Sequence, residues 1–140
     1  MAGRLARFSI SMDEELLLRL DKHLRRRGYR NRSEAFRDMA RQILGEQQLK
    51  KPEAEGVAVL SIVYDHHRLD LPARLTDIQH KNIKNITCTL HVHLDRHHCL
   101  EVLVMRGKAG ELKRIGDALI SLNGIKYGRI NLMVPKNLLP

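Results

Sequence analysis

The sequence contains only two cysteines in 140 residues, and its N-terminus carries no apolar segment typical of a secretion signal. We therefore expect no disulfide framework and a reducing, cytoplasmic environment, in which a free thiol is available as a ligand. No apolar run approaches the ~18 residues needed to span a bilayer, so we expect no membrane partner. A length of 140 residues allows one domain or two small ones, and oligomerisation would relieve the shortage of core in a small module.

Positive charge is in excess, and most of the excess lies near the N-terminus. The formal net charge is +9. Residues 1–51 hold thirteen Lys and Arg against seven Asp and Glu, whereas the remaining residues hold twelve against nine. A basic surface favours a polyanionic partner, but a charge-rich helix is more often a solvated face. The charge therefore needs a motif before it indicates DNA binding.

Residues 7–12 predict a short strand that has no partner strand in this part of the chain. Apolar side chains alternate with Arg7, Ser9 and Ser11, which share the polar face. A lone strand leaves its backbone groups unpaired, so the simplest solution is pairing with the same strand of a second copy. Such a ribbon fits the major groove of DNA, where arginine and hydroxyl side chains reach base edges. An ordinary dimerisation arm is the alternative, which the basic surroundings disfavour.

Two helices are predicted after this strand. Ser11 and Glu14 have capping-box spacing, and the apolar periodicity that follows ends at Gly28. Asn31 and Glu34 repeat that spacing in a weaker form before a second periodic segment. The N-terminal part is thus expected to fold as strand, helix, helix.

The remaining sequence predicts an α+β domain after a polar linker at residues 49–56. Residues 57–64 form a nearly continuous apolar run, typical of a strand buried on both faces. A helix over about 70–84, a hairpin, a helix after Gly110 and a last alternating strand follow. The order βαββαβ is that of the ferredoxin-like fold.

Two histidines and a cysteine form a candidate metal site in the predicted hairpin. His91 and His93 share the polar face of its first strand, and Cys88 is excluded as a ligand because it lies on the apolar face, which we expect to be the core face. Matching apolar face to apolar face fixes the parity of the register, so that the loop has an odd number of residues, and the natural pairing then sets His93 opposite Cys99. The same register sets His91 opposite Glu101. Directly opposed side chains lie roughly 4.5–5.5 Å apart at Cβ, so one ion can bridge the two strands.

Each part of this cluster has an ordinary interpretation. An isolated pair of strand histidines is more often solvent-exposed, and a lone cysteine is more often a small buried apolar residue. The register of Cys99 with the histidines favours the metal site over both. The other histidines that flank the predicted strands are expected at the surface: His66, His67, His97 and His98.

The chain resembles the nickel-responsive regulator family of the NikR type over nearly its whole length. The ligand segments 89–93 and 99–101 match best, and residues 7–13, 27–35 and 58–64 match as well. The resemblance implies a ribbon-helix-helix DNA-binding domain, a linker, and an ACT-like metal-sensing domain of the ferredoxin-like type, at residues 1–48, 49–56 and 57–140. It also implies a homotetramer, a dimer of dimers in which two ribbon-helix-helix dimers flank the central ACT-like domains, and operator DNA as the partner.

The resemblance further implies a complete ligand set. Three ligands would come from one subunit and the fourth, His80, from a neighbour, with one Ni(II) per chain. Three imidazoles and a thiolate in a plane suit Ni(II) or Cu(II). A secondary cation site would match Glu34 and Asp38. The residues implied to bind DNA are Arg7, Ser9 and Ser11 at base edges and Asn31, Arg32 and Ser33 at phosphates.

The resemblance thus predicts a Ni(II)-activated repressor of nickel uptake genes that is not an enzyme. One alternative is a metal-independent ribbon-helix-helix regulator whose ACT-like domain binds a small effector at the loop of residues 107–110. A zinc hydrolase is a second alternative, and it is disfavoured because His80 would fill the open coordination position. Glu101 would also be its only nearby general base.

Overall fold

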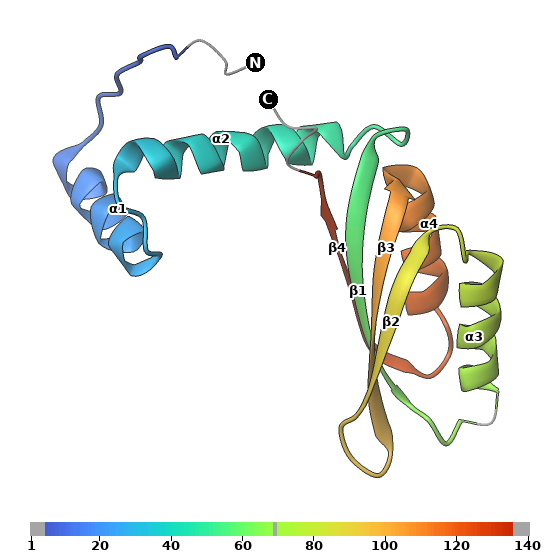
Figure 1. Ribbon diagram of the computed structural model, residues 1–140. Coiled ribbons are helices and arrows are strands. Elements are labelled where there is room, and N and C mark those ends of the chain that lie inside the picture. The colour runs from blue at the N-terminus through green and yellow to red at the C-terminus, as the bar shows by residue number, and fades with distance from the viewer. Residues whose placement is uncertain (1–4, 69, 136–140) are drawn as a thin grey trace. The chain divides into compact units, whose positions relative to one another are not determined.

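The computed structural model describes residues 5–68 and 70–135 of the chain (Figure 1). Two compact units are distinguished, Met1–Ala40 and Arg41–Pro140. Within the described ranges, no helix is long and apolar enough to cross a membrane.

The N-terminal unit contains helix α1 (Glu14–Arg26) and the first part of helix α2 (Arg32–Gln48). The carboxylate of Asp13 caps α1 and accepts hydrogen bonds from the backbone N–H groups of Glu15 and Leu16 at 3.0 and 3.3 Å. The prediction that Ser11 caps this helix was therefore wrong, because a stronger acceptor stands directly before the first turn.

The start of α2 confirms the second capping prediction. The side-chain oxygen of Asn31 accepts a hydrogen bond from the Glu34 N–H at 2.8 Å. Before α1, residues 5–13 form no strand within this single chain, and Phe8 packs edge-on against Phe36 with ring centroids 6.5 Å apart. The pairing of residues 7–12 with a second copy stays a prediction.

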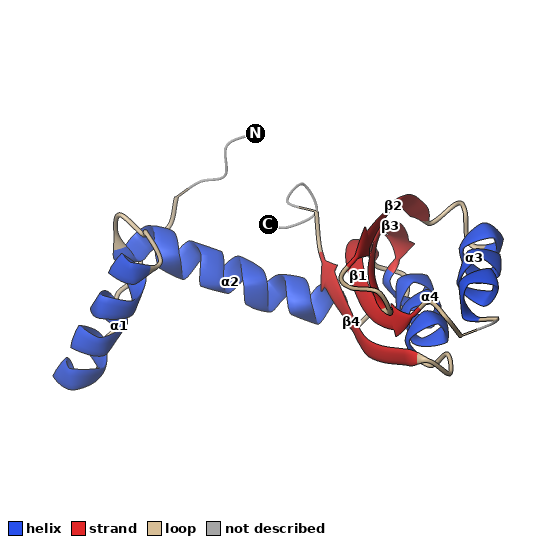
Figure 2. Cartoon of the chain, turned by 90° about the horizontal axis from the view of Figure 1, so that it is seen from below, coloured by secondary structure: helices blue, strands red, loops and turns tan. Residues whose placement is uncertain are grey.

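The C-terminal unit confirms the predicted βαββαβ order. Its strands are β1 (Glu55–Asp65), β2 (Ile86–His93), β3 (His98–Lys108) and β4 (Ile125–Met133). They form one antiparallel sheet in the order β2-β3-β1-β4. Helices α3 (Leu71–Lys81) and α4 (Ala109–Ile120) both lie on one side of this sheet (Figure 1, Figure 2).

The core of this unit lies between the two helices and one face of the sheet. Alternation along β1 and β3 turns every second side chain toward the helices, where it is buried. The largest fully buried side chains are Leu60, Ile62, Leu71, Leu75, Leu103, Met105, Leu112, Ile115 and Leu119. These contacts fix β3, which carries Cys99, whereas β2, which carries His91 and His93, is held by its pairing with β3.

The face of the hairpin that we expected to be core is the open one. Cys88 is exposed, and 59% of the Leu90 residue is accessible to solvent. The strand at 57–64 is likewise buried on its helix-facing side and only partly buried on the other. The helices cover the face of β3 that bears Cys99. This face is also rich in apolar side chains, so alternation along the strand alone does not predict which face the helices cover. Cys88 still lies on the opposite face from His91 and His93.

Candidate metal centre

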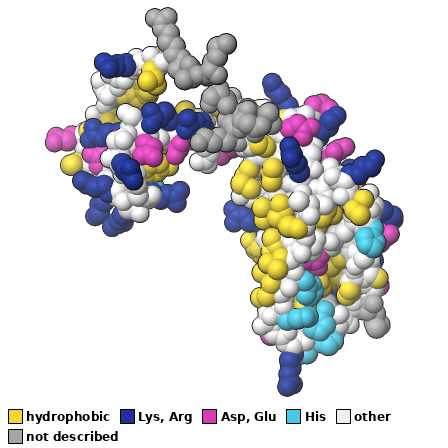
Figure 3. Space-filling view, in the orientation of Figure 1, with side chains coloured by type: hydrophobic (Ala, Val, Ile, Leu, Met, Phe, Trp, Pro, Cys, Tyr) yellow, Lys and Arg dark blue, Asp and Glu magenta, His cyan; other side chains and the backbone are white. Residues whose placement is uncertain are grey.

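The hairpin of β2 and β3 brings the three sequence-predicted ligands of one chain together. His93 pairs with Cys99 and His91 pairs with Glu101, which confirms the predicted register. Ligand atoms of His91, His93 and Cys99 all lie within 4.8 Å of one another, on the described part of the chain. Figure 3 shows histidine side chains, in cyan, gathered at the lower end of the C-terminal unit in this view.

Cys99 is the buried member of the cluster. Its Sγ lies 3.4 Å from His93 Nδ1 and 3.5 Å from His66 Nδ1. Burial raises the pKa of the Cys99 thiol, and the carboxylates of Asp95, Glu101 and Asp65 raise it further. A thiol with a raised pKa keeps its proton at neutral pH, so a metal ion must displace that proton to bind the sulfur.

A buried hydrogen-bond network supports His91. Glu101 is only 5% exposed and accepts a hydrogen bond from the Tyr64 hydroxyl at 2.9 Å. The same hydroxyl oxygen lies 3.4 Å from His91 Nδ1. Because the Tyr64 hydroxyl donates its hydrogen bond to the Glu101 carboxylate, the hydroxyl oxygen can accept a hydrogen bond from the Nδ1–H of His91. That tautomer leaves the lone pair of Nε2 free for a metal ion.

Helix α3 joins the same network through Gln79. Its amide nitrogen donates to Glu101 and its amide oxygen accepts from the Thr89 hydroxyl at 3.0 Å. Burial raises the pKa of Tyr64, and the negative charge of Glu101 raises it further, so the tyrosine stays a donor across the physiological range. Sequence reasoning missed the role of Gln79. The only available indication was that a buried Glu101 would need donors from somewhere.

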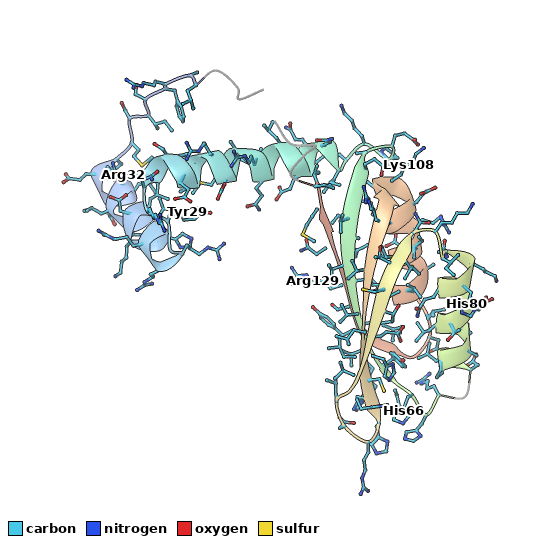
Figure 4. All side chains as sticks on the ribbon, in the orientation of Figure 1. Tyr29, Arg32, His66, His80, Lys108 and Arg129 are labelled. Carbon is cyan, nitrogen blue, oxygen red and sulfur yellow. The ribbon has the colours of Figure 1, made fainter. Side chains whose placement is uncertain are left out.

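His80 lies apart from the other three candidate ligands within one chain. It follows Gln79 on α3, where Figure 4 labels it, and its side chain is exposed to solvent. The group of converging metal-binding atoms in the described residues consists of His91, His93 and Cys99 without it. One chain therefore brings three candidate ligands together, and His80 is not among them.

The candidate DNA-binding residues all lie in the N-terminal unit. Arg7, Ser9 and Ser11 are exposed in the segment that precedes α1. Arg32 makes two hydrogen bonds to the Asp21 carboxylate of α1, at 2.7 and 2.6 Å. This pair, which lowers the pKa of Asp21, ties the two helices together and already uses part of the Arg32 guanidinium.

The remaining predicted residues lie on or beside α2. Ser33 is exposed in its first turn, and the Asn31 side chain is engaged as the helix cap. Glu34 and Asp38 lie one turn apart, with Glu34 partly buried and Asp38 exposed. That spacing places both carboxylates on one side of the helix.

In the alternative function, a small effector would bind at the loop of residues 107–110. The backbone N–H groups at this loop are already hydrogen-bonded to another segment of the same chain. The backbone N–H groups of Ala109 and Gly110, at the start of α4, donate to the carbonyl oxygens of Ala54 and Pro52 at 2.8 and 2.9 Å. A side chain at Gly110 would meet Pro52 atoms at 3.0–3.3 Å. These N–H groups are the ones that a small carboxylate effector would need at this helix terminus.

Comparisons with known proteins match both parts of the chain. The family model described as the NikR C terminal nickel binding domain matches residues 57–133. The model of the ribbon-helix-helix protein, copG family, matches residues 6–47. The first match covers more than half of the chain and includes the whole candidate ligand cluster.

Curated relatives extend this likeness over nearly the full length. A protein of Geotalea uraniireducens (strain Rf4) is 49% identical over 128 residues, covering 91% of this chain and 92% of the relative. A protein of Geobacter sp. (strain M21) is 48% identical with the same coverage. A protein of Lawsonia intracellularis (strain PHE/MN1-00) is 44% identical over 131 residues and 94% of both chains. All three are named as nickel-responsive regulators, and this chain belongs to their family, a class of transcription regulators and not of enzymes.

Proposed function

We propose that this chain is a Ni(II)-activated DNA-binding repressor of nickel uptake genes, which acts in the cytoplasm. The observation that carries the proposal is the convergence of His91, His93 and Cys99 in a nickel-binding type of domain, in a chain that also contains a ribbon-helix-helix segment. One Ni(II) per chain would be held by these three side chains and by the partner subunit's His80.

The donor set suits a planar Ni(II) site. Imidazole nitrogens and a thiolate bind Ni(II) and Cu(II), and the affinity order places Cu(II) higher, so selectivity rests on geometry and on metal supply in the cell. The Tyr64–Glu101 network favours the His91 tautomer that is protonated on Nδ1 and can bind metal through Nε2. Displacement of the Cys99 proton then supplies the thiolate.

Metal binding would couple neighbouring subunits through α3. His80 and Gln79 are adjacent on this helix, and Gln79 is hydrogen-bonded to the Glu101 that supports His91. A nickel ion bound by His80 of one subunit and by the cluster of another would favour the arrangement in which both are in reach. Nickel shifts the equilibrium only as far as it binds this arrangement more tightly.

The open face of the sheet supports a homotetramer. Exposed apolar side chains on this face include Leu90, Val92, Tyr127 and Met133. Patches of this kind on a regulator favour burial against further subunits. We propose a dimer of dimers with the C-terminal units at its centre.

The N-terminal units would pair as ribbon-helix-helix dimers on operator DNA. Arg7, Ser9 and Ser11 would face the major groove from the paired ribbon. Asn31, Arg32 and Ser33 would contact phosphate near the start of α2, which requires Arg32 to share its guanidinium with Asp21. Glu34 and Asp38 would hold a secondary cation.

Subunit mixing tests the shared site directly. One chain carries His80→Ala and keeps its three-ligand cluster, and the second carries His93→Ala and Cys99→Ser and keeps His80. Neither variant alone can form the four-ligand site, but each mixed pair can form one. We expect the mixture to regain the nickel-to-thiolate absorption band of the wild-type protein and nickel-dependent binding to operator DNA.

The matched control pairs the His93→Ala, Cys99→Ser chain with a His80→Ala, Cys99→Ser chain, which lacks a complete cluster in any combination. Recovery in the control, or no recovery in the first mixture, would contradict a site shared between subunits. DNA affinity that does not change with nickel in the wild type would instead favour the metal-independent regulator.

A further inference from the structure

The turn between β2 and β3 is closed by hydrogen bonds to one carboxylate. It connects His93 to Cys99 at the lower end of the sheet in Figure 1. The Asp95 carboxylate accepts hydrogen bonds from the backbone N–H groups of His97 and His98 at 2.7 and 2.8 Å. Because the two candidate ligands stand at the ends of this turn, its conformation decides how they face each other.

His98, which directly precedes Cys99, has partners at both ring nitrogens, whereas the sequence predicted a surface position. Its side chain is 31% exposed. Its Nδ1 lies 2.8 Å from the nearer oxygen of the Asp95 carboxylate, and its Nε2 lies 2.9 Å from Nζ of Lys126. An ammonium group can only donate, so Nε2 accepts, and Nδ1 carries the proton and donates to Asp95. Lys126 thus selects the tautomer that closes the turn.

Lys126 reaches His98 from two strands away. His98 begins β3, Lys126 lies near the start of β4, and β1 runs between these two strands. Neighbouring strands are about 4.7–4.9 Å apart, so β3 and β4 are separated by roughly 9–10 Å. Lysine combines a long, flexible stem with a charged donor, which suits this distance. The hydrogen bond therefore ties the turn of the hairpin to the opposite edge strand of the sheet.

Strand β2 depends on this turn because it lies at the edge of the sheet. Every residue of β2 after Ile86 is exposed. His91 and His93 are therefore placed by the pairing of β2 with β3 and by the turn that joins the two strands. A site whose ligands are already in position loses less conformational freedom when it binds its ion. A fixed turn should thus raise the affinity for metal.

We propose that Lys126 is a positioning residue for the metal cluster, which acts through His98 to fix the turn that sets Cys99 opposite His93. The inference rests on the proposed function, because this cluster is the candidate nickel site. Lys126 does not itself bind the ion, since an ammonium group has no lone pair to offer. The same hydrogen bonds engage both nitrogens of His98, which makes His98 a structural residue of the turn and not an additional ligand.

The first experiment measures the nickel affinity of the full-length protein by competition with a chelator. Lys126→Met removes the donor and keeps a long side chain, whereas Lys126→Arg keeps a donor. Lys113→Met is the matched control, because Lys113 also donates a hydrogen bond, to the Leu49 carbonyl at 3.3 Å. We expect Lys126→Met to weaken nickel binding by about 2–10-fold, the effect of one hydrogen bond. Lys126→Arg should restore most of this loss, and Lys113→Met should leave nickel affinity unchanged.

A double-mutant cycle shows whether Lys126 acts through His98. The variant His98→Phe keeps an aromatic ring but has no ring nitrogen, so Lys126→Met should cost no further nickel affinity in that background. Amide hydrogen exchange of the metal-free protein gives a readout without nickel. Lys126→Met should speed exchange at the N–H groups of His97 and His98, and should leave exchange in helix α4 unchanged.

Three results would overturn the role of Lys126. They are unchanged nickel affinity in Lys126→Met, an equal loss in Lys113→Met, and a loss in the His98→Phe background as large as in the wild type. Failure of the proposed function is a separate result, since it requires that wild-type protein bind nickel no better than a Cys99→Ser variant. In that case hydrogen exchange still tests the bond, and equal exchange at His97 and His98 with and without Lys126 would overturn it.

Discussion

Replacement of Tyr64 by phenylalanine tests the buried network that supports the metal cluster. The change removes one hydroxyl, which donates to Glu101 at 2.9 Å and lies 3.4 Å from His91 Nδ1. Glu101 is 5% exposed, so water does not readily replace the lost donor, and among the residues that the structure describes only Gln79 still donates a side-chain hydrogen bond to it. A hydrogen bond to a charged group contributes about 1.5–3 kcal/mol, and we expect the free energy of unfolding of the metal-free protein to fall by that amount.

The same substitution should weaken nickel binding. Without the tyrosine oxygen, the Nδ1–H of His91 loses its acceptor, and loss of such a partner costs roughly 10–100-fold in metal affinity. Equilibrium urea unfolding at one protein concentration measures the first effect, and competition with a nickel chelator measures the second. Tyr127→Phe is the matched control, because Tyr127 is 54% exposed and its hydroxyl makes no hydrogen bond to the part of the chain that the structure describes. Equal losses in the two variants, or none in Tyr64→Phe, would refute this reasoning.

Three further predictions concern the proton, the helix cap and the DNA. Because burial raises the pKa of Cys99, nickel binding should release one proton from it, and affinity should rise about tenfold per pH unit between neutral pH and that raised pKa; a flat profile in pH-dependent titrations would contradict this. Asp13→Ala should lower the free energy of unfolding by about 1 kcal/mol while Ser11→Ala leaves it unchanged, as measured by urea unfolding, and the reverse order would restore Ser11 as the cap. Arg7→Ala should cost about 1–3 kcal/mol of discrimination at one base pair in DNA-binding assays, whereas a uniform loss across sequences would make Arg7 a phosphate contact.

The pairing within the hairpin could be predicted from the sequence because side chains along a strand alternate between only two faces. Once apolar faces are matched, only loops with an odd number of residues remain, and the natural one of these sets His93 opposite Cys99, the register that the sheet has. The covered face could not be predicted in the same way. Both faces of β3 carry apolar side chains, and helix packing from α3 and α4 decides which of them is buried.

The supporting residues lay beyond sequence reasoning because they come from distant segments. Gln79 and Tyr64 reach Glu101 from positions 22 and 37 residues away, and His66 reaches Cys99 across 33. No periodicity relates such positions, and only the folded sheet brings them together. The prediction of the residue that caps α1 was wrong for a different reason. Ser11 and Asp13 are both good capping residues, and local spacing alone did not separate them.

The most direct test of the central claim is a titration of reduced, metal-free protein with Ni(II), followed through the nickel-to-thiolate absorption band. Wild-type protein and a Cys99→Ser variant are measured side by side. We predict saturation at one nickel per chain in the wild type and loss of the band in the variant. No band, or weak binding that is the same in both proteins, would contradict a nickel site at His91, His93 and Cys99.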